Sequence, residues 1–299
     1  MIVFIYLKKQ LGIDISESFS VSNKKVHHML QDVNLNQFVF NQGFLECGNK
    51  KIDLTSFLTV AAEEIAKKSA VFETNNMHNL TNVLRSRSEM GVFSDYPHFY
   101  EMCKEGQSTG ELFGQRETEN GNFVISCQKD VFCLYGQNFM GQLCANMLGT
   151  QFDLYDFGLE PKNLKELPKG FLPRQRLVMT IEYDSNFFAE APRAFRVTLY
   201  DLKAKQQTVM AKFENLQPKF NKQRGCYTLN FFGRVQKASA RNFQLVRSVE
   251  EGEEPIEDFT LSHGKCSANN FNLDFREPFS PMVSFASSLS AIGKKRVVG

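Results

Sequence analysis

The sequence predicts a mainly β fold, a sandwich or a barrel, that is closed near its end by one buried helix. Apolar and polar residues alternate in many short runs, for example at residues 177–181 and 195–199, which is typical of strands with one face in the core. Turn-forming pairs such as Asn120-Gly121 separate these runs. An uncharged apolar segment follows the last run and favours a helix that is covered by the β structure.

Residues 1–79 differ from the rest in their pattern of apolar and polar residues, and they are predicted to form a partly helical extension. Ser22 is a suitable cap for a short helix, and Asp53 or Thr55 for a longer one. The longer segment carries an apolar stripe at helical spacing over residues 57–65, so we expect it to dock on the neighbouring domain.

The most informative segment begins near Leu229 and predicts two half-buried strands joined by a tight corner. Leu229 and Phe231 alternate with polar residues, and so do Phe243 and Leu245. Gly233 lies between the two runs and supplies a corner position that needs no Cβ.

The predicted helix begins just after Ser280, which is a good N-cap, and Pro281 suits the first helical position. Met282, Phe285 and Leu289 follow at helical spacing, and no charged residue occurs from Ser280 to Gly293. A helix without a charged face is a buried helix. One such helix at the end of an all-β chain is expected to fill the lumen of a barrel.

Composition and motifs argue against most enzyme classes. The 299 residues are 42% hydrophobic and 23% charged, which allows a real core, and the net charge of +2 is too close to zero to indicate nucleic-acid binding. The chain contains none of the common nucleotide-binding, hydrolase or metalloprotease motifs, and its five histidines are dispersed. We therefore expect no catalytic residues, no cofactor and no metal site.

Membrane contact is expected to be peripheral. The apolar run at residues 1–7 is too short for a signal sequence or a membrane span, and no longer run exists. The seven cysteines are scattered and form no C-x-x-C pair, which is typical of reduced thiols in the cytoplasm.

A family resemblance adds to these interpretations. The string that starts at Gly233, G-R-V-x-x-A-S-x-x-N-F-Q, resembles the signature of the Tubby C-terminal domain. Further similar stretches follow the family order, namely Asp95–Tyr100, Gly121–Ser126, Phe139–Phe152, Tyr155–Gly158 and Leu273–Phe275. The resemblance covers the chain from about residue 80 to its end, so we expect a domain at 80–299 after the extension at 1–79.

The resemblance implies both a fold and a function. The fold is a closed antiparallel barrel of twelve strands around a hydrophobic C-terminal helix. The function is non-enzymatic binding of phosphoinositide headgroups at the cytoplasmic membrane surface, in an adaptor whose relatives deliver membrane receptors to cilia. The expected partners are therefore these headgroups, the membrane surface and a protein cargo, and no nucleic acid is expected.

The residues that would bind the headgroup depart from the family pattern. Gln142 and Cys144 occupy the positions where the family has Lys and Arg, and residues 114–120 contain one Arg and two Glu. Arg116 is thus the family cation that remains. A basic pocket rebuilt from other residues would draw on Arg85, Arg87, Lys169, Arg174 and Arg176.

Three functional hypotheses remain open at this point. The first is a peripheral phosphoinositide-binding adaptor with a rebuilt basic pocket. The second is a protein-interaction module that kept the barrel and lost the lipid site. The third is a transcription-related regulator, against which the near-neutral charge and the lack of a basic DNA-reading helix argue.

Overall fold

The computed structural model describes most of the chain from residue 66 to residue 293. The described residues are 38–41, 44–47, 50–53, 66–87, 96–134, 138–158, 175–184, 194–204, 206–223, 225–249 and 258–293. For those between 38 and 53, and for 226 and 227, only the backbone strands are described. The chain divides into two units. One comprises Met1–Ala70, Cys133–Phe139 and Phe157–Gln175, and the other comprises Val71–Phe132, Met140–Asp156 and Arg176–Gly299.

Twelve antiparallel strands close into a barrel, which confirms the predicted fold. They are β4 (Asn79–Arg87), β5 (His98–Lys104), β6 (Gly110–Arg116), β7 (Phe123–Ser126), β8 (Phe139–Ala145), β9 (Gln151–Asp156), β10 (Leu177–Tyr183), β11 (Phe195–Tyr200), β12 (Val209–Asn215), β15 (Phe243–Arg247), β16 (Leu261–Lys265) and β17 (Asn270–Phe275). The barrel closes where β17 pairs with β4, from Asn270 opposite Leu84 to Phe275 opposite Asn79. The strands expected from alternation at residues 177–181 and 195–199 are β10 and β11.

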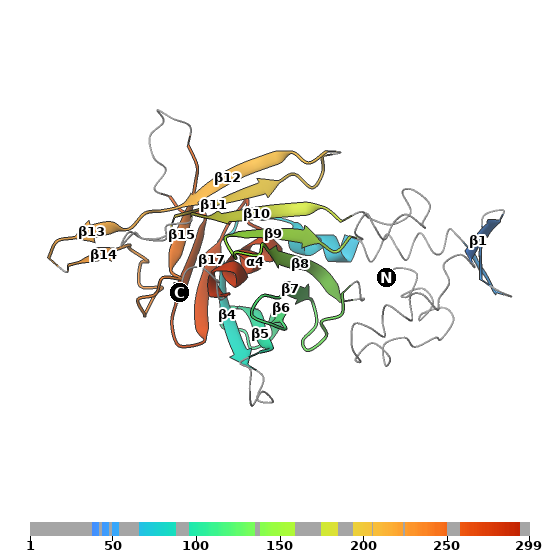
Figure 1. The fold of residues 1–299 in the computed structure, drawn as a ribbon, viewed down its shortest axis with the longest axis horizontal. Helices are drawn as coiled ribbons and strands as arrows, with labels where there is room; N and C mark the ends of the chain where they lie inside the picture. Colours follow the sequence, from blue (N-terminus) through green and yellow to red (C-terminus); the bar gives the residue numbers. More distant parts are fainter. Residues whose placement is uncertain are drawn as a thin grey trace. The chain divides into compact units, whose positions relative to one another are not determined.

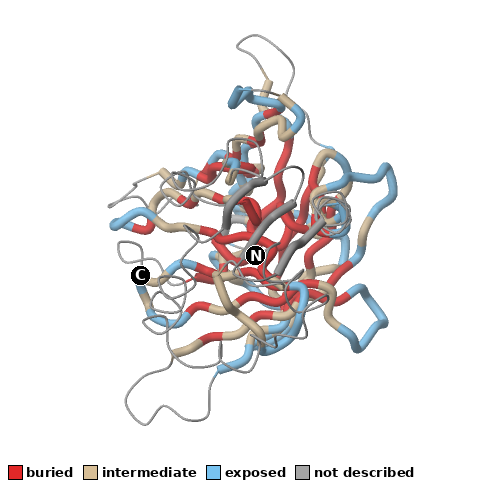
Figure 2. Tube along the Cα trace, turned by 90° about the vertical axis from the view of Figure 1, so that its right-hand side faces the viewer, coloured by how far each residue is buried: buried red, intermediate tan, exposed pale blue. Residues whose placement is uncertain are grey.

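Helix α4 (Pro281–Ile292) fills the barrel, as the uncharged sequence predicted (Figure 1). Its cap is Ser280, whose hydroxyl accepts a hydrogen bond from the Val283 amide at 3.3 Å. Nearly every side chain of α4 is buried, and Figure 2 shows the buried residues gathered inside the ring of strands. Two of the buried serines satisfy their hydroxyls within the helix: Ser287 donates to the Val283 carbonyl at 2.9 Å, and Ser290 donates to the Ser287 carbonyl at 2.8 Å.

The signature segment differs in part from its prediction. Its second strand is β15, as expected, but the first strand, β14 (Cys226–Thr228), ends before Leu229. Leu229 and Phe231 therefore lie outside any strand, and the prediction of a strand there was wrong. The reason is a turn at Phe232, whose amide donates to the Asn230 side chain and whose φ of +50° is followed by +81° at Gly233. The expected corner at Gly233 and the second strand are confirmed. β14 pairs with β13 (Lys219–Asn221) in a separate two-stranded sheet.

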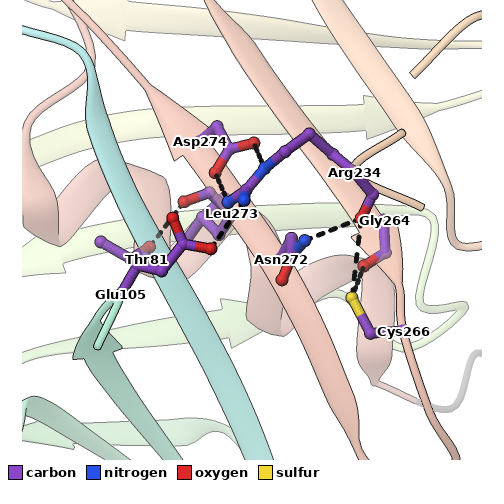
Figure 3. Close-up of polar contacts among 8 residues, drawn as sticks. All are labelled: Thr81, Glu105, Arg234, Gly264, Cys266, Asn272, Leu273 and Asp274. Carbon is purple, nitrogen blue, oxygen red and sulfur yellow. Dashed lines mark hydrogen bonds and ion pairs between the residues drawn. The ribbon is translucent and has the colours of Figure 1, made fainter. Parts of the chain in front are cut away.

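Arg234 then fastens this segment to the outside of the barrel (Figure 3). Its guanidinium donates to both Asp274 carboxylate oxygens, at 2.8 and 2.7 Å, and to Glu105 at 2.6 Å. These bonds raise the pKa of Arg234, with the Asp274 hydrogen bonds as the main cause. Val235 packs directly against Gly264, where a Cβ would overlap it. The G-R-V string therefore encodes a turn, an ionic clamp and a close packing contact.

The other unit contains a small sheet that sequence analysis did not predict. Its strands are β1 (Phe38–Asn41), β2 (Phe44–Cys47) and β3 (Lys50–Asp53), paired in that order. Asp53 ends a strand, and the expected helices at Ser22 and over residues 57–65 lie outside the described residues. Helical structure is described at residues 66–69, followed by the 3-10 turn η3 (Ala70–Phe72).

The burial of His263 on β16 leads us to predict that the stability of the barrel falls at acid pH. Its ring stacks between Phe243 and Phe271, with centroids 5.1 and 5.2 Å away, and its Nδ1–H donates to the Arg241 carbonyl at 2.8 Å. Burial lowers the pKa of His263 to about 4. The folded state therefore excludes a proton that the unfolded chain binds below about pH 6.5. Stability should be fully present above that pH and fall by about 3 kcal/mol as the pH drops to about 4.

This prediction is checked by urea unfolding of the wild type and of His263→Phe at several pH values. The variant loses the hydrogen bond to Arg241, so its stability should be lower than that of the wild type near neutral pH, but its decline between pH 6.5 and 4 should be shallower. Parallel curves for the two proteins would show that His263 does not carry the acid response.

Candidate functional site

The predicted lipid-binding residues do not form one group. Lys169 and Arg174 lie outside the described residues. Arg176 lies just before β10, at the opposite end of the barrel from Arg87 and Arg116, which end β4 and β6. We call the end at which α4 terminates the exit end, and Arg85, Arg87 and Arg116 lie there.

Arg116 faces the barrel interior and not the solvent. Its side chain is buried, its Nε donates to the Gly121 carbonyl at 2.9 Å, and its guanidinium lies 4.7 Å from the centre of the Phe123 ring. A Cβ on Gly293, directly after α4, would lie 3.1 Å from Nη1 of Arg116. The cation therefore sits beside the negative end of the helix dipole. Burial lowers the pKa of Arg116, and the nearby Glu119 carboxylate acts in the opposite direction.

Arg176 is held by an acidic partner. Its Nε donates to Asp156 at 2.8 Å, its backbone amide donates to the same carboxylate at 2.9 Å, and Nη1 donates to the Leu202 carbonyl at 2.5 Å. Because Asp156 is almost fully buried, this ion pair joins β9 to β10. Its geometry is that of a structural clamp.

Arg85, Arg87 and Arg241 form what we call the arginine cluster at the exit end. Arg85 and Arg87 are two residues apart on β4, and Arg241 comes directly before β15. The three lie close enough that Arg87 and Arg241 each lower the pKa of Arg85, although burial is the larger cause. Repulsion between like charges is unfavourable unless an anion relieves it.

The surroundings of Arg85 and Arg241 leave these two side chains able to receive an anion. Arg85 donates to the neutral side chain of Asn269, at 2.9 Å from Nη2 and 3.3 Å from Nε. Among the residues that the structure describes, no carboxylate forms an ion pair with Arg85 or Arg241. Arginine suits phosphate ligands because its guanidinium group can bind them through two parallel N–H donors.

Tyr100 adds a polar group beneath the arginine cluster. It pairs with Arg85 across β4 and β5, and its ring is buried against Phe123 with centroids 5.6 Å apart. Burial raises the pKa of Tyr100 to about 12, although Arg116, Arg85 and Arg241 all lower it. The phenol therefore stays a neutral donor at physiological pH, which is compatible with an anionic ligand.

The outer face of the barrel lacks cations at the positions that the family resemblance singles out. Leu143 faces the interior, so Gln142 and Cys144 on either side of it face outward by strand alternation. Cys144 lies opposite Asp153 on β9. The cations of the arginine cluster thus lie at the rim of the barrel, at its exit end, and not on this outer face.

Arg241 belongs to the arginine cluster, although sequence reasoning did not place it among the candidate lipid-binding residues. It belongs to the signature segment, which the sequence indicated only as scaffold. Arg234 in the same segment does serve the scaffold, but Arg241 reaches the rim beside Arg85. The sequence feature that could have indicated Arg241 is its position directly before a predicted strand, because charged residues at strand ends lie at the rim of a barrel.

The described residues offer little further chemistry. None of their helices has the length and apolar character needed to cross a bilayer. In the same part of the chain, no three His, Cys, Asp or Glu side chains are arranged to hold a metal ion. Burial raises the pKa of the Cys103, Cys133 and Cys266 thiols, which disfavours the reactive thiolate form.

Comparison with known proteins identifies similar chains. The model of the Tub family matches residues 73–215 and 200–294. Tubby-related protein 2 of Mus musculus is 28% identical over 240 residues, which are 71% of this chain and 42% of that protein. Tubby-related protein 1 of Homo sapiens is 28% identical over 225 residues, 67% and 40% of the two chains, and Protein king tubby of Anopheles gambiae is 28% identical over 204 residues, 60% and 43%. The matched region thus spans about two fifths of the length of these relatives.

Proposed function

Because the chain belongs to the Tub family, we propose that it is a non-enzymatic adaptor that binds phosphoinositide headgroups and associates peripherally with membranes. The arginine cluster is the observation that carries this proposal. Arg85 and Arg241 repel each other and have no acidic partner among the described residues, so an anion with several phosphates would relieve their repulsion.

The proposal moves the binding site from the outer face to the rim of the barrel. Gln142 and Cys144 cannot neutralise phosphate charge, and Arg116 is turned toward α4. Arg85, Arg87 and Arg241 project from two separate strand ends and supply the convergent cations that adjacent ring phosphates need. A rim site would also let the headgroup bind while its acyl chains remain in the bilayer.

The cellular part of the proposal follows from the family alone. We place the protein at the cytoplasmic face of membranes, including that of the cilium, where it would help to deliver a membrane-protein cargo. This role is testable by co-precipitation of membrane receptors with the wild type and with the rim variants described next.

Vesicle sedimentation tests the lipid proposal. The wild type should pellet with phosphatidylcholine vesicles that contain phosphatidylinositol bisphosphate, and the double variant Arg85→Gln/Arg241→Gln should bind about thirtyfold more weakly, since each cation contributes about 1 kcal/mol at an anionic surface. Binding should also weaken as salt is added.

The matched control is Lys212→Gln/Arg247→Gln, which removes the same charge from exposed positions on β12 and β15, away from the arginine cluster. It should bind almost as the wild type does. If the wild type fails to pellet even at low salt, the lipid proposal is wrong, and the protein-interaction module becomes the better account.

A further inference from the structure

The turn between β8 and β9 exposes two apolar side chains in succession. Met147 is 82% exposed and Leu148 is 55% exposed. The turn itself is well fixed, because the Asn146 side chain accepts hydrogen bonds from the Thr150 amide at 2.9 Å and the Gln151 amide at 3.2 Å. The Gly149 amide also donates to the Asn146 carbonyl at 3.0 Å. An ordered turn therefore holds two apolar side chains in water.

This turn lies at the same end of the barrel as the arginine cluster. Neighbouring strands around the barrel from β8 through β9, β10 and onward to β17 and β4 are all antiparallel. β8 therefore runs in the same direction as β4 and β6. β8 therefore ends, at Ala145, on the exit end where β6 ends at Arg116. β5, β6 and β7 separate β4 from β8, so the turn lies about 20 Å around the barrel from the end of β4, which carries Arg85 and Arg87.

We propose that Met147 and Leu148 form a membrane-inserting wedge that enters the bilayer interface while the arginine cluster holds a phosphoinositide headgroup. The wedge rests on the proposed lipid binding and adds a second, apolar contact to it. Residues 145–150 carry no charge, so nothing in the turn opposes insertion. Cations and an apolar tip at the same end of the barrel can contact one anionic membrane surface together.

A membrane fits this turn better than a protein partner does. Two side chains cannot supply the roughly 800 Å² per partner that a stable protein interface buries. They do match the shallow interfacial layer, about 5–10 Å deep, in which peripheral proteins bury apolar side chains.

The chain contains no tryptophan, so Leu148→Trp places a single fluorescent reporter in the turn. With vesicles of phosphatidylcholine and phosphatidylinositol bisphosphate, its emission should shift to the blue and be quenched by brominated acyl chains. The control is Met77→Trp, which is 70% exposed and lies just before β4 at the opposite barrel end. Its emission should not change. Unchanged emission from Trp at position 148 while the protein pellets would overturn the wedge.

A second variant separates the wedge from headgroup binding. Met147→Ser/Leu148→Ser should weaken vesicle binding about tenfold, since it removes apolar surface from the bilayer contact. Its affinity for soluble inositol trisphosphate, measured by calorimetry, should equal that of the wild type. Equal vesicle binding by both proteins would reject the wedge and leave the lipid proposal intact. A wild type that binds neither vesicles nor the soluble headgroup would reject both.

Discussion

Leu289→Asp should prevent the domain from folding. Leu289 is fully buried in α4, and its Cδ1 would lie 3.3 Å from a Cβ on Gly114 of β6. Truncating a buried leucine alone costs about 2–5 kcal/mol. A carboxylate in this dry lumen adds a desolvation cost of several kcal/mol. The sum reaches the total stability of a typical domain, about 5–15 kcal/mol.

Expression and circular dichroism of three proteins check this prediction. Leu289→Asp should be insoluble or lack a cooperative melt, whereas Leu148→Asp, the same change at an exposed turn, should melt close to the wild type. Leu289→Met, which conserves volume, should lose less than about 1.5 kcal/mol. A soluble Leu289→Asp protein with a cooperative melt would contradict the placement of α4 in the lumen.

Gly141→Ala should cost about 3 kcal/mol or more. A Cβ at this position of β8 would overlap the Tyr155 carbonyl oxygen and would lie 2.8 Å from Cε of Met282 on α4. The Tyr155 oxygen belongs to the backbone of β9, so it cannot move aside without disturbing the pairing of the two strands. In a domain of this size, that loss lowers the melting temperature by about 10 °C.

Gly106→Ala is the control for the loss of a glycine as such. Gly106 has a φ of +78° but nothing lies within 4 Å of its Cβ position, so only the backbone preference is lost, about 1–2 kcal/mol. In thermal melts, Gly141→Ala should therefore have a clearly lower melting temperature than Gly106→Ala. Equal melting temperatures would mean that β8 and β9 can separate enough to accept the methyl group.

Periodicity allowed the wall of the barrel and its filling helix to be predicted. Strand alternation in β10 and β11 is visible because one face is buried and the other is not. The helix was visible because Ser280, Pro281 and an uncharged run coincide. The false strand at Leu229 and Phe231 had the same alternation, but the side chain of Asn230 closed a turn there, and such local bonds compete with strand pairing.

The binding site was less predictable than the fold. Arg85 and Arg87 were identified as candidates from charge alone, but charge could not distinguish them from Arg176, which an almost fully buried carboxylate neutralises. Nor could it show that Arg116 points into the barrel. Those distinctions depend on which side chains meet across strands that are distant in the sequence.

The sequence alone determined the family, the β barrel and its central helix, because each depends on local order and on the periodic burial of side chains. Only the tertiary structure decided which cations are structural and which are available. Closure of β17 on β4 carries Arg241 to the rim beside Arg85, and the common direction of β4, β6 and β8 brings an apolar turn to the same end. Proximity across a closed barrel is a property of pairing between remote strands, which short-range patterns do not encode.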